Sequence, residues 1–371
     1  MITRRDFAVR IGAAMAAGRM LPEMAYAQRA MIPGNLPKDM VWLNANENPL
    51  GPPKSSLAAM AEVLAASGRY HYQEVRDFYA AVAHSEDLEP ENILAGSGSS
   101  EMLHAAVDAF TAPDRPMVVM HPTYEGPPET ARAMHRQVIQ VPLLPDYSAD
   151  VRKLAEAADK AHAGLIYMCN PNNPTASITP KAEMAWLVQN LPSETVLLVD
   201  EAYIHFGESD NLETAMPYVR QGKNVVVART FSKIYGMAGV RAGFVCAPSA
   251  LIQRMRPFRN NVLSIIAMRA VLAALPEART MVPERRAINS RIRGELCAWL
   301  RERKLPYIES QANFMMIDVG RNAREFITKM PPMGVAVGRP FPPLDNMLRV
   351  TIGTGAEMQK FRDVFWRVYK A

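Results

Sequence analysis

The sequence predicts an α/β protein that has a mostly parallel central sheet in a large domain and a second, smaller α+β domain. Short apolar runs such as TVLLVDEAY (195–203) and NVVVART (224–230) alternate with stretches of helical spacing. Near-continuous apolar strands of this kind are typical of a parallel sheet that helices cover on both faces. This alternation stops near residue 252, and the 371 residues are enough for two domains.

The elements expected in the large domain, at 54–255, follow in order. Residues 28–53 are rich in proline and indicate an extended arm, which we expect to pack with the small domain. Residues 54–67 have helical spacing, and residues 89–110 indicate a short strand, a Gly/Ser turn and an apolar-periodic helix. The remaining expected strands are RPMVVM (115–120), GLIYMCN (164–170), TVLLVDEAY, NVVVART and AGFVCA (242–247).

The small domain is expected at 256–371. A long helical stretch covers residues 276–304, and a closing helix covers 355–370. Three short strands are expected between them, NFMMIDV (313–319), GVAVG (334–338) and MLRVTIG (347–353). A few strands packed against long helices are typical of an α+β unit.

The first 27 residues resemble an export signal. Arg4 and Arg5 precede Phe7 and a stretch of small and apolar residues, and Ala25-Tyr26-Ala27 matches an A-x-A cleavage pattern. The stretch is too short and too rich in arginine to span a bilayer. Because TRRDF resembles a twin-arginine signal, we expect a mature periplasmic chain that begins at Gln28 and carries a tightly held cofactor. The alternative is a frayed amphipathic start.

Composition argues against several functional classes. The net charge of +5 is spread over the chain without a basic run that aromatic residues interrupt, so nucleic-acid binding is not expected. Cys169, Cys246 and Cys297 lack the spacing of a metal site and are expected to be small buried hydrophobic residues. The histidines show no metal-binding pattern either, so we expect neither a metal nor a membrane span.

One lysine stands at the end of a predicted buried strand. Lys233 lies in RTFSKIYGMAGVRAGF (229–244), and a lysine is rarely buried without a partner or a function. Asp200 ends the preceding strand, where α/β sheets bind ligands, and Tyr203 follows it. A lysine that forms a Schiff base, an aspartate that pairs with the ring nitrogen and a phenol near the ring oxygen make up a pyridoxal 5'-phosphate site. Taken alone, Asp200 is also compatible with a solvated strand end.

A phosphate cradle is expected at Gly96–Glu101. Backbone N–H groups at the start of the following helix, with the Ser99 and Ser100 hydroxyls, suit a dianion. A serine followed by a glutamate is equally typical of ordinary helix capping. Further hydroxyls and a positive charge are expected from Thr230, Ser232 and Arg241.

Four motifs resemble those of the class I and II aminotransferases, which are pyridoxal phosphate enzymes of fold type I. In chain order they are CNPNNPTA (169–176), VDEAYIHF (199–206), TFSKIYGMAGVRAGF (230–244) and LRVTIGT (348–354). The opening WLNANENPLGPP (42–53) resembles the histidinol-phosphate aminotransferase branch in particular. The resemblance covers essentially all of the chain after the signal, and it implies the fold-type I transferase fold.

The resemblance implies roles for the residues that match the motifs. Lys233 would form the internal aldimine and move the substrate proton, and Asp200 would pair with the ring nitrogen. Tyr203 and Asn173 would bind the ring oxygen, and Tyr124 would stack on the ring. The implied phosphate ligands are Ser99, Ser100, Thr230, Ser232 and Arg241.

The substrate side and the subunit contact follow from the same resemblance. Arg349 would bind the substrate α-carboxylate, and Tyr70 would reach the phosphate of a neighbouring subunit, which implies a homodimer with shared sites. The chain departs from the family at Ala176, where glycine is usual, and after Tyr70, where proline is usual. The loop GRPFPP (338–343) also departs, and we expect its arginine, Arg339, with Asn46, to contact the distal end of the substrate.

The expected function is that of a pyridoxal phosphate-dependent aminotransferase. Through a Lys233 aldimine it would move an amino group between an amino acid or amino-phosphate and a 2-oxo acid. The sequence leaves two alternatives open. One is another reaction of the same aldimine, as in an amino-acid oxidase, decarboxylase or racemase, and the other is a non-enzymatic protein that binds the cofactor.

Overall fold

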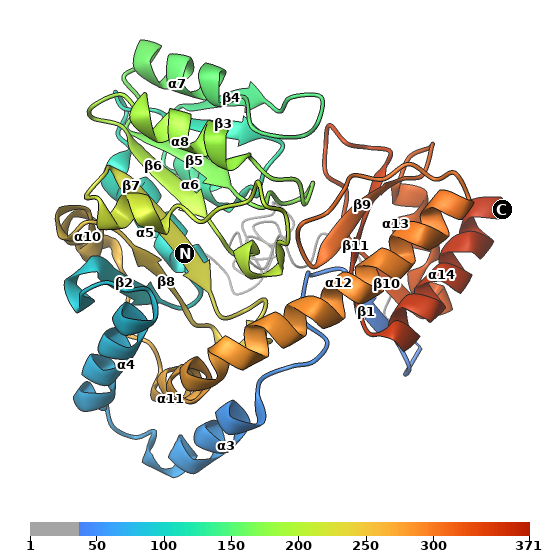
Figure 1. Ribbon diagram of the computed structural model, residues 1–371, viewed down its shortest axis with the longest axis horizontal. Helices are drawn as coiled ribbons and strands as arrows, with labels where there is room; N and C mark the ends of the chain where they lie inside the picture. The colour runs from blue at the N-terminus through green and yellow to red at the C-terminus, as the bar shows by residue number, and fades with distance from the viewer. Residues whose placement is uncertain (1–36) are drawn as a thin grey trace, which may run out of the picture.

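The computed structural model describes residues 37–371, so the expected export signal and the first residues of the arm lie outside the described residues. Figure 1 shows two bodies, a helix-covered sheet and a smaller unit at the C-terminal end, with the long helix α12 (Ala278–Glu302) running between them. Within residues 37–371, no helix has the length and apolar character needed to cross a membrane.

The large domain is built on a seven-stranded sheet with the strand order β2-β8-β7-β6-β5-β3-β4. All neighbours from β7 to β4 are parallel, and β8 is antiparallel to both β2 and β7. This confirms the predicted mostly parallel sheet. In sheet order the strands are Ile93–Gly96, Gly243–Cys246, Val225–Thr230, Val196–Asp200, Leu165–Cys169, Met117–His121 and Val138–Pro142.

The central strands are buried along their whole length. Every residue of β5, β6 and β7 is buried, as the near-continuous apolar runs predict, because helices cover both faces of the sheet. The strand β4 is different, since most of its residues are partly or fully exposed at the sheet edge. Its sequence, VIQVP, is not an unbroken apolar run, and it is absent from the strands expected above.

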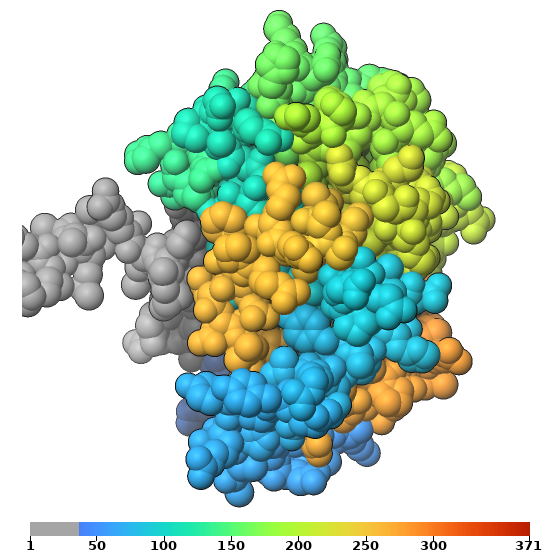
Figure 2. Space-filling view, turned by 90° about the vertical axis from the view of Figure 1, so that its left-hand side faces the viewer, coloured from blue at the N-terminus to red at the C-terminus, as the bar shows by residue number. Residues whose placement is uncertain are grey.

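Nine helices of the described chain surround or extend the sheet. They are α3 (Lys54–Val63), α4 (Tyr72–Ser85), α5 (Ser99–Phe110), α6 (Gly126–Ala133), α7 (Val151–Lys160), α8 (Lys181–Gln189), α9 (Met216–Arg220), α10 (Ser249–Met255) and α11 (Ile265–Ala274). Helix α11 packs against α3 and α4, and Figure 2 shows its gold segment beside the blue segment that holds α3. The buried core of the large domain includes Met281 and Val282 of α12, so packing follows the chain past the expected boundary after residue 255.

The small domain joins the N-terminal arm to the C-terminal third. Strands β9 (Phe314–Asp318) and β11 (Met347–Thr351) pair in antiparallel fashion, and β1 (Val41–Leu43) of the arm pairs in parallel with β10 (Val335–Val337). Their apolar faces form one core with α12 and two further helices, α13 (Arg324–Lys329) and α14 (Gly355–Lys370). The residues that follow β1 therefore reach the large domain from a fixed position.

Candidate active site

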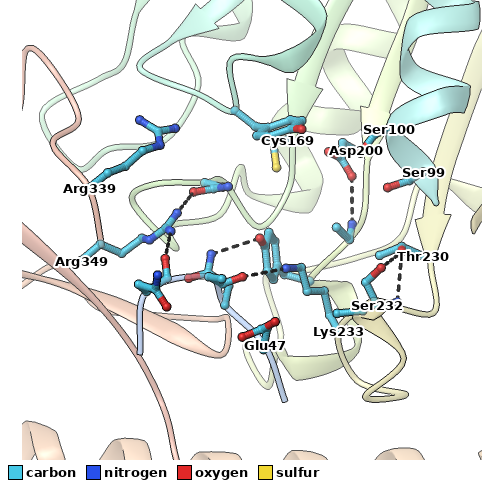
Figure 3. Close-up of a pocket in the computed structure, with 18 of the residues that line it drawn as sticks. Glu47, Ser99, Ser100, Cys169, Asp200, Thr230, Ser232, Lys233, Arg339 and Arg349 are labelled. Carbon is cyan, nitrogen blue, oxygen red and sulfur yellow. Dashed lines mark hydrogen bonds between the residues drawn. The ribbon is translucent and has the colours of Figure 1, made fainter. Parts of the chain in front are cut away.

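A cavity of about 540 Å³ lies between the carboxyl ends of the central strands, the N-terminal arm and the small domain. Its lining contains every predicted site residue except Tyr70, and Figure 3 labels eight of these residues together with Glu47 and Cys169. The predicted residues that line it are Asn46, Ser99, Ser100, Tyr124, Asn173, Asp200, Tyr203, Thr230, Ser232, Lys233, Arg241, Arg339 and Arg349. Parallel strands place their carboxyl ends on one sheet edge, which brings these distant segments together.

A buried ion-paired group holds two of the strand ends. Glu201 directly follows β6, and its carboxylate accepts hydrogen bonds from Arg229 Nε at 3.0 Å and Nη2 at 2.9 Å near the end of β7. The same carboxylate accepts hydrogen bonds from the Thr214 hydroxyl and the Ala215 amide. Arg229 also pairs with Glu86. These contacts fix the backbone on either side of the cavity, so Glu201 has a structural role beside Asp200.

Lys233 extends from the turn after β7 into the cavity. Its Nζ donates to the Ala45 carbonyl at 3.2 Å and lies 5.6 Å from the centre of the Tyr203 ring. Burial lowers the pKa of this amine to about 8, and the positive charges of Arg349 and Arg241 act in the same direction. The amine is therefore partly unprotonated near neutral pH, as a nucleophile or a proton acceptor requires.

The turn after Lys233 depends on a glycine. Gly236 has φ +69°, and its amide donates to the Lys233 carbonyl at 3.0 Å. A Cβ at Gly236 would lie 2.1 Å from the Gly51 carbonyl oxygen, which is too close for any side chain. The arm therefore packs directly against the backbone of the lysine turn.

Asp200 is buried at the end of β6, and sequence reasoning missed one of its partners. Its Oδ1 accepts from the Ala202 amide at 3.1 Å, and its Oδ2 accepts from the Tyr167 hydroxyl at 3.2 Å. Burial raises the pKa of the Asp200 carboxyl to about 6, and both hydrogen bonds oppose that shift. Tyr167 lies on the adjacent strand β5 and is fully buried. The available signal was a tyrosine inside an apolar strand, because a buried hydroxyl needs a partner.

The segment predicted to be a phosphate cradle lies at the start of helix α5, where Ser99 and Ser100 line the cavity. Gly98 is the N-cap and no side chain caps the helix, while the Glu101 carboxylate accepts from the Ser97 amide. The serine-capping alternative is therefore not what the structure contains. A Cβ at Gly98 would lie 2.4 Å from the guanidinium of Arg241, and a Cβ at Gly243 would lie 2.2 Å from the Ser99 amide. Only glycines allow this approach.

Arg241 and the hydroxyls of Thr230 and Ser232 line the same cavity. Arg241 donates to the Ser97 carbonyl at 3.2 Å and to the Ala238 carbonyl at 2.9 Å. The Thr230 hydroxyl donates to the Ser232 hydroxyl at 2.9 Å. A cation, a helix N-terminus and several hydroxyls within one pocket form a fitting site for a phosphate group.

On the small-domain side, Arg349 is a buried cation. Its guanidinium donates to Asn173 Oδ1 at 2.7 Å and to the Asn44 carbonyl at 2.8 Å. Its Nε is buried and has no hydrogen-bond partner within residues 37–371, and no carboxylate of that part of the chain forms an ion pair with it. Burial lowers the pKa of Arg349 to about 10. A buried guanidinium without a counter-ion favours an anionic ligand.

Asn46 lies beside Tyr203. Its Nδ2 donates to the Tyr203 hydroxyl at 3.1 Å, and its backbone amide donates to the Thr351 hydroxyl at 2.9 Å. Burial raises the pKa of the Tyr203 hydroxyl, which is therefore protonated and available as a donor. The expected contact of Asn46 with the distal end of a substrate stays a prediction.

The two remaining predicted residues, Arg339 and Tyr70, differ in their position relative to the cavity. Arg339 lines the cavity and forms an ion pair with Glu125, a residue that sequence reasoning did not select. Tyr70 is 73% exposed, packs against Tyr72 and does not line the cavity of its own subunit. Within the described part of the chain, no cluster of three or more His, Cys, Asp or Glu residues could hold a metal ion.

Comparison with known proteins identifies relatives over nearly the whole chain. A family model described as aminotransferase class I and II matches residues 38–365. A histidinol-phosphate aminotransferase of Symbiobacterium thermophilum is 36% identical over 331 residues, which are 87% of this chain and 89% of that protein. One of Moorella thermoacetica is 34% identical over 334 residues, 87% of this chain and 84% of that protein. A crystal structure of histidinol-phosphate aminotransferase from Sinorhizobium meliloti in complex with pyridoxal-5'-phosphate has a TM-score of 0.85 and 26% identity, covering 95% of this chain and 98% of that chain.

Proposed function

This chain belongs to the class I and II aminotransferases, and from that premise we propose that its amino donor is an α-amino acid held by Arg349. The predicted fold-type I architecture, pyridoxal 5'-phosphate as cofactor and aminotransferase activity are confirmed. The enzyme therefore transfers an amino group between a small-molecule donor and a 2-oxo acid. The family match favours this reaction over the oxidation, decarboxylation and racemisation considered above.

The residues of the cavity fit the cofactor. The glycines at 98 and 243 let the Arg241 guanidinium and the Ser99 backbone come close to each other's segments at the start of α5, and Arg241 with the neighbouring hydroxyls would hold a phosphate there. Asp200 would pair with the ring nitrogen, and Tyr203 and Asn173 would bind the ring oxygen. When bound, pyridoxal 5'-phosphate supplies an aldehyde that condenses with amines and a ring that withdraws electrons from the adjacent substrate carbon.

The side chains then have separate tasks. Lys233 Nζ, whose pKa is lowered to about 8, would accept the proton from the substrate Cα and would then donate it to the cofactor. Asp200 carries a negative charge at neutral pH, because its pKa of about 6 lies below 7, and so holds the ring nitrogen protonated. Arg349 fixes the carboxylate and with it the direction of the Cα–H bond.

The observation that carries the choice of donor is the buried Arg349 guanidinium, which has an orphan Nε and no ion pair within residues 37–371. An α-carboxylate supplies the missing charge and accepts the remaining N–H groups in a fork geometry. A second candidate donor is histidinol phosphate, which the names of the relatives favour. Its phosphate would have to take the place of the carboxylate.

A donor panel tests this proposal. The purified holoenzyme is mixed with α-amino acids, with the matching amines that lack the carboxylate and with histidinol phosphate. Conversion of the cofactor to its pyridoxamine form is followed by absorbance. We expect α-amino acids to react and their decarboxylated counterparts to react at least about a hundredfold more slowly, the loss expected for a buried charge pair. If histidinol phosphate reacts efficiently and the α-amino acids do not, the proposed donor is wrong and histidinol phosphate is the donor.

The contact between Tyr167 and Asp200 predicts a pH-dependent change in cofactor affinity. In Tyr167→Phe the carboxylate loses a hydrogen bond, so the pKa of Asp200 should rise further above 6. A protonated Asp200 must lose its proton to pair with the ring nitrogen, so affinity falls toward acid. We expect cofactor-free Tyr167→Phe to bind the cofactor about tenfold more weakly than wild type at pH 6.5, with the deficit fading above pH 8, where both carboxyls are ionised. A deficit that is equal at all pH values would show only a packing role.

We also propose that the enzyme is a homodimer with shared active sites. Helix α3 and the segment after it expose large apolar side chains, namely Leu57 at 50%, Leu64 at 56%, Tyr70 at 73% and Tyr72 at 68%. Exposed apolar clusters of this kind mark subunit interfaces. The absence of Tyr70 from the cavity of its own subunit supports its expected position at the neighbouring phosphate. Light scattering of the holoenzyme should give twice the mass of the chain.

We propose, finally, that the chain is exported by the twin-arginine pathway. The support is the sequence alone, the Arg4-Arg5 pair and the Ala25-Tyr26-Ala27 pattern. N-terminal sequencing of the protein from the periplasmic fraction should begin at Gln28. An intact N-terminus on a cytoplasmic protein would contradict this proposal.

A further inference from the structure

Two arginines of the small domain share one side of the cavity. The Arg349 and Arg339 guanidinium carbons lie 4.6 and 4.2 Å from the centre of the same aromatic ring, that of Phe341. Figure 3 shows both side chains extending into the cavity from the small domain. A donor whose α-carboxylate binds Arg349 therefore has Arg339 within reach of its side chain.

The two arginines differ in their charge environment. Arg349 has only neutral hydrogen-bond acceptors among residues 37–371. Arg339 forms an ion pair with Glu125, and the side chains are only 16% and 22% exposed. Glu129, one helical turn further along α6, adds a second negative charge close enough to interact with Arg339. The positive charge of Arg339 is therefore already balanced by a carboxylate of the protein.

The local sequence explains how Glu125 reaches this position. In TYEGPPE (123–129), Tyr124 lines the cavity and Glu125 precedes the first residue of α6, Gly126. A Cβ at Gly126 would lie 2.7 Å from the Tyr124 ring, so the glycine lets that ring pack over the helix start. The next side chain, Glu125, then pairs with Arg339 across the domains.

We propose that Glu125 determines side-chain specificity by occupying Arg339, so that the site selects amino acids with an uncharged side chain over those with a second anionic group. This inference rests on the proposed function, because it assumes that the α-carboxylate lies at Arg349. A distal carboxylate or phosphate can bind Arg339 only by displacing Glu125, and it then meets the repulsion of that carboxylate. An uncharged side chain leaves the ion pair intact.

Glutamine and glutamate provide a matched pair of donors, since they differ in charge and hardly in shape. Wild-type holoenzyme should show a kcat/KM for glutamine at least about tenfold above that for glutamate, the scale of one charged contact. Glu125→Gln should lower this ratio about tenfold by freeing Arg339. Glu129→Gln also removes one negative charge but leaves the ion pair between Glu125 and Arg339 in place. In this variant the glutamine-to-glutamate ratio of kcat/KM should change less than about twofold.

The contact itself is tested in a double-mutant cycle. In an Arg339→Gln background, Glu125→Gln should no longer alter the glutamine-to-glutamate ratio, because its effect acts through Arg339. If Glu125→Gln leaves the ratio within about twofold of wild type, or if Glu129→Gln has an equal effect, the inference is overturned.

Binding of unreactive ligands decides the inference even if a variant does not fold or no donor reacts. Calorimetry on the wild-type holoenzyme should show glutaric acid monoamide binding about tenfold more tightly than glutarate, which differs by one charge. Tighter binding of glutarate would overturn the inference. Failure of every amino acid in the donor panel would refute the proposed donor class and leave this comparison of binding constants intact.

Discussion

Lys233→Ala should abolish transamination while the protein keeps its fold. Among residues 37–371, Lys233 is the one lysine that lines the cavity, and it would serve both as nucleophile and as proton carrier, so the loss should reach about 10⁴-fold or more in kcat. Lys223, an exposed lysine ten positions earlier in the sequence, offers a control, since its replacement by alanine should leave turnover unchanged. Near-normal turnover by Lys233→Ala would remove the basis of the assigned mechanism.

The lowered pKa of Lys233 also predicts how the melting temperature of Lys233→Ala depends on pH. The pKa of Lys233 is lowered from 10.5 to about 8 in the folded protein, so the unfolded chain binds the proton more tightly. The cost to the folded state is full below pH 8 and disappears as the pH rises toward 10.5. Cofactor-free Lys233→Ala should therefore melt at the same or a higher temperature than wild type at pH 7, with the gain lost near pH 10.5. A lower melting temperature at pH 7 would show that the amine stabilises the fold.

Arg349→Ala should reduce the kcat/KM of all α-amino acids together. Truncating one partner of a buried hydrogen-bonded charge pair costs about 2–5 kcal/mol, which corresponds to a loss of about thirtyfold to several thousandfold. Cofactor affinity should change little, because the phosphate cradle lies at the start of α5 on the large domain. Amines without a carboxylate serve as the internal control and should lose little.

Arg339→Ala provides the matched comparison, because it removes a guanidinium from the same side of the cavity. It should change the ranking of amino acids by side chain and leave their common requirement for a carboxylate in place. Uniform loss in Arg339→Ala, or indifference of Arg349→Ala, would mean that substrate carboxylates are held elsewhere.

The sequence predicts best the parts of the fold that a local pattern determines. The buried strands β5, β6 and β7 appear as near-continuous apolar runs, because each is covered on both faces. The edge strand β4 is half exposed, so its pattern is weak and it was missed. The packing of α11 with the large domain depends on contacts with α3, which is about 200 residues away in the chain and leaves no local trace.

The residues of the site likewise fall into those that the sequence identifies and those that it does not. Residues such as Lys233 and Asp200 stand at strand ends, where motif and position agree, and the structure brings them to one cavity. Tyr167 and Glu125 lack such a signal. The role of Tyr167 depends on the register of β5 beside β6, and that of Glu125 depends on how the two domains meet. Neither relation is visible in the order of residues along the chain.

The ion-paired group of Glu201, Arg229 and Glu86 links chemistry to the integrity of the whole molecule. Glu201 and Arg229 flank the strand ends that carry Asp200 and precede Lys233, and both are buried in the large domain, while the Glu86 side chain is 15% exposed. Separating these charges without water would be prohibitively unfavourable, so the group resists local opening and separates only when the interior becomes hydrated. The residues proposed for catalysis on the large domain, Asp200 and Lys233, thus belong to a cooperative unit of the protein. On heating, the loss of activity and the loss of structure should follow one curve, and the enzyme should offer no partly melted, partly active form.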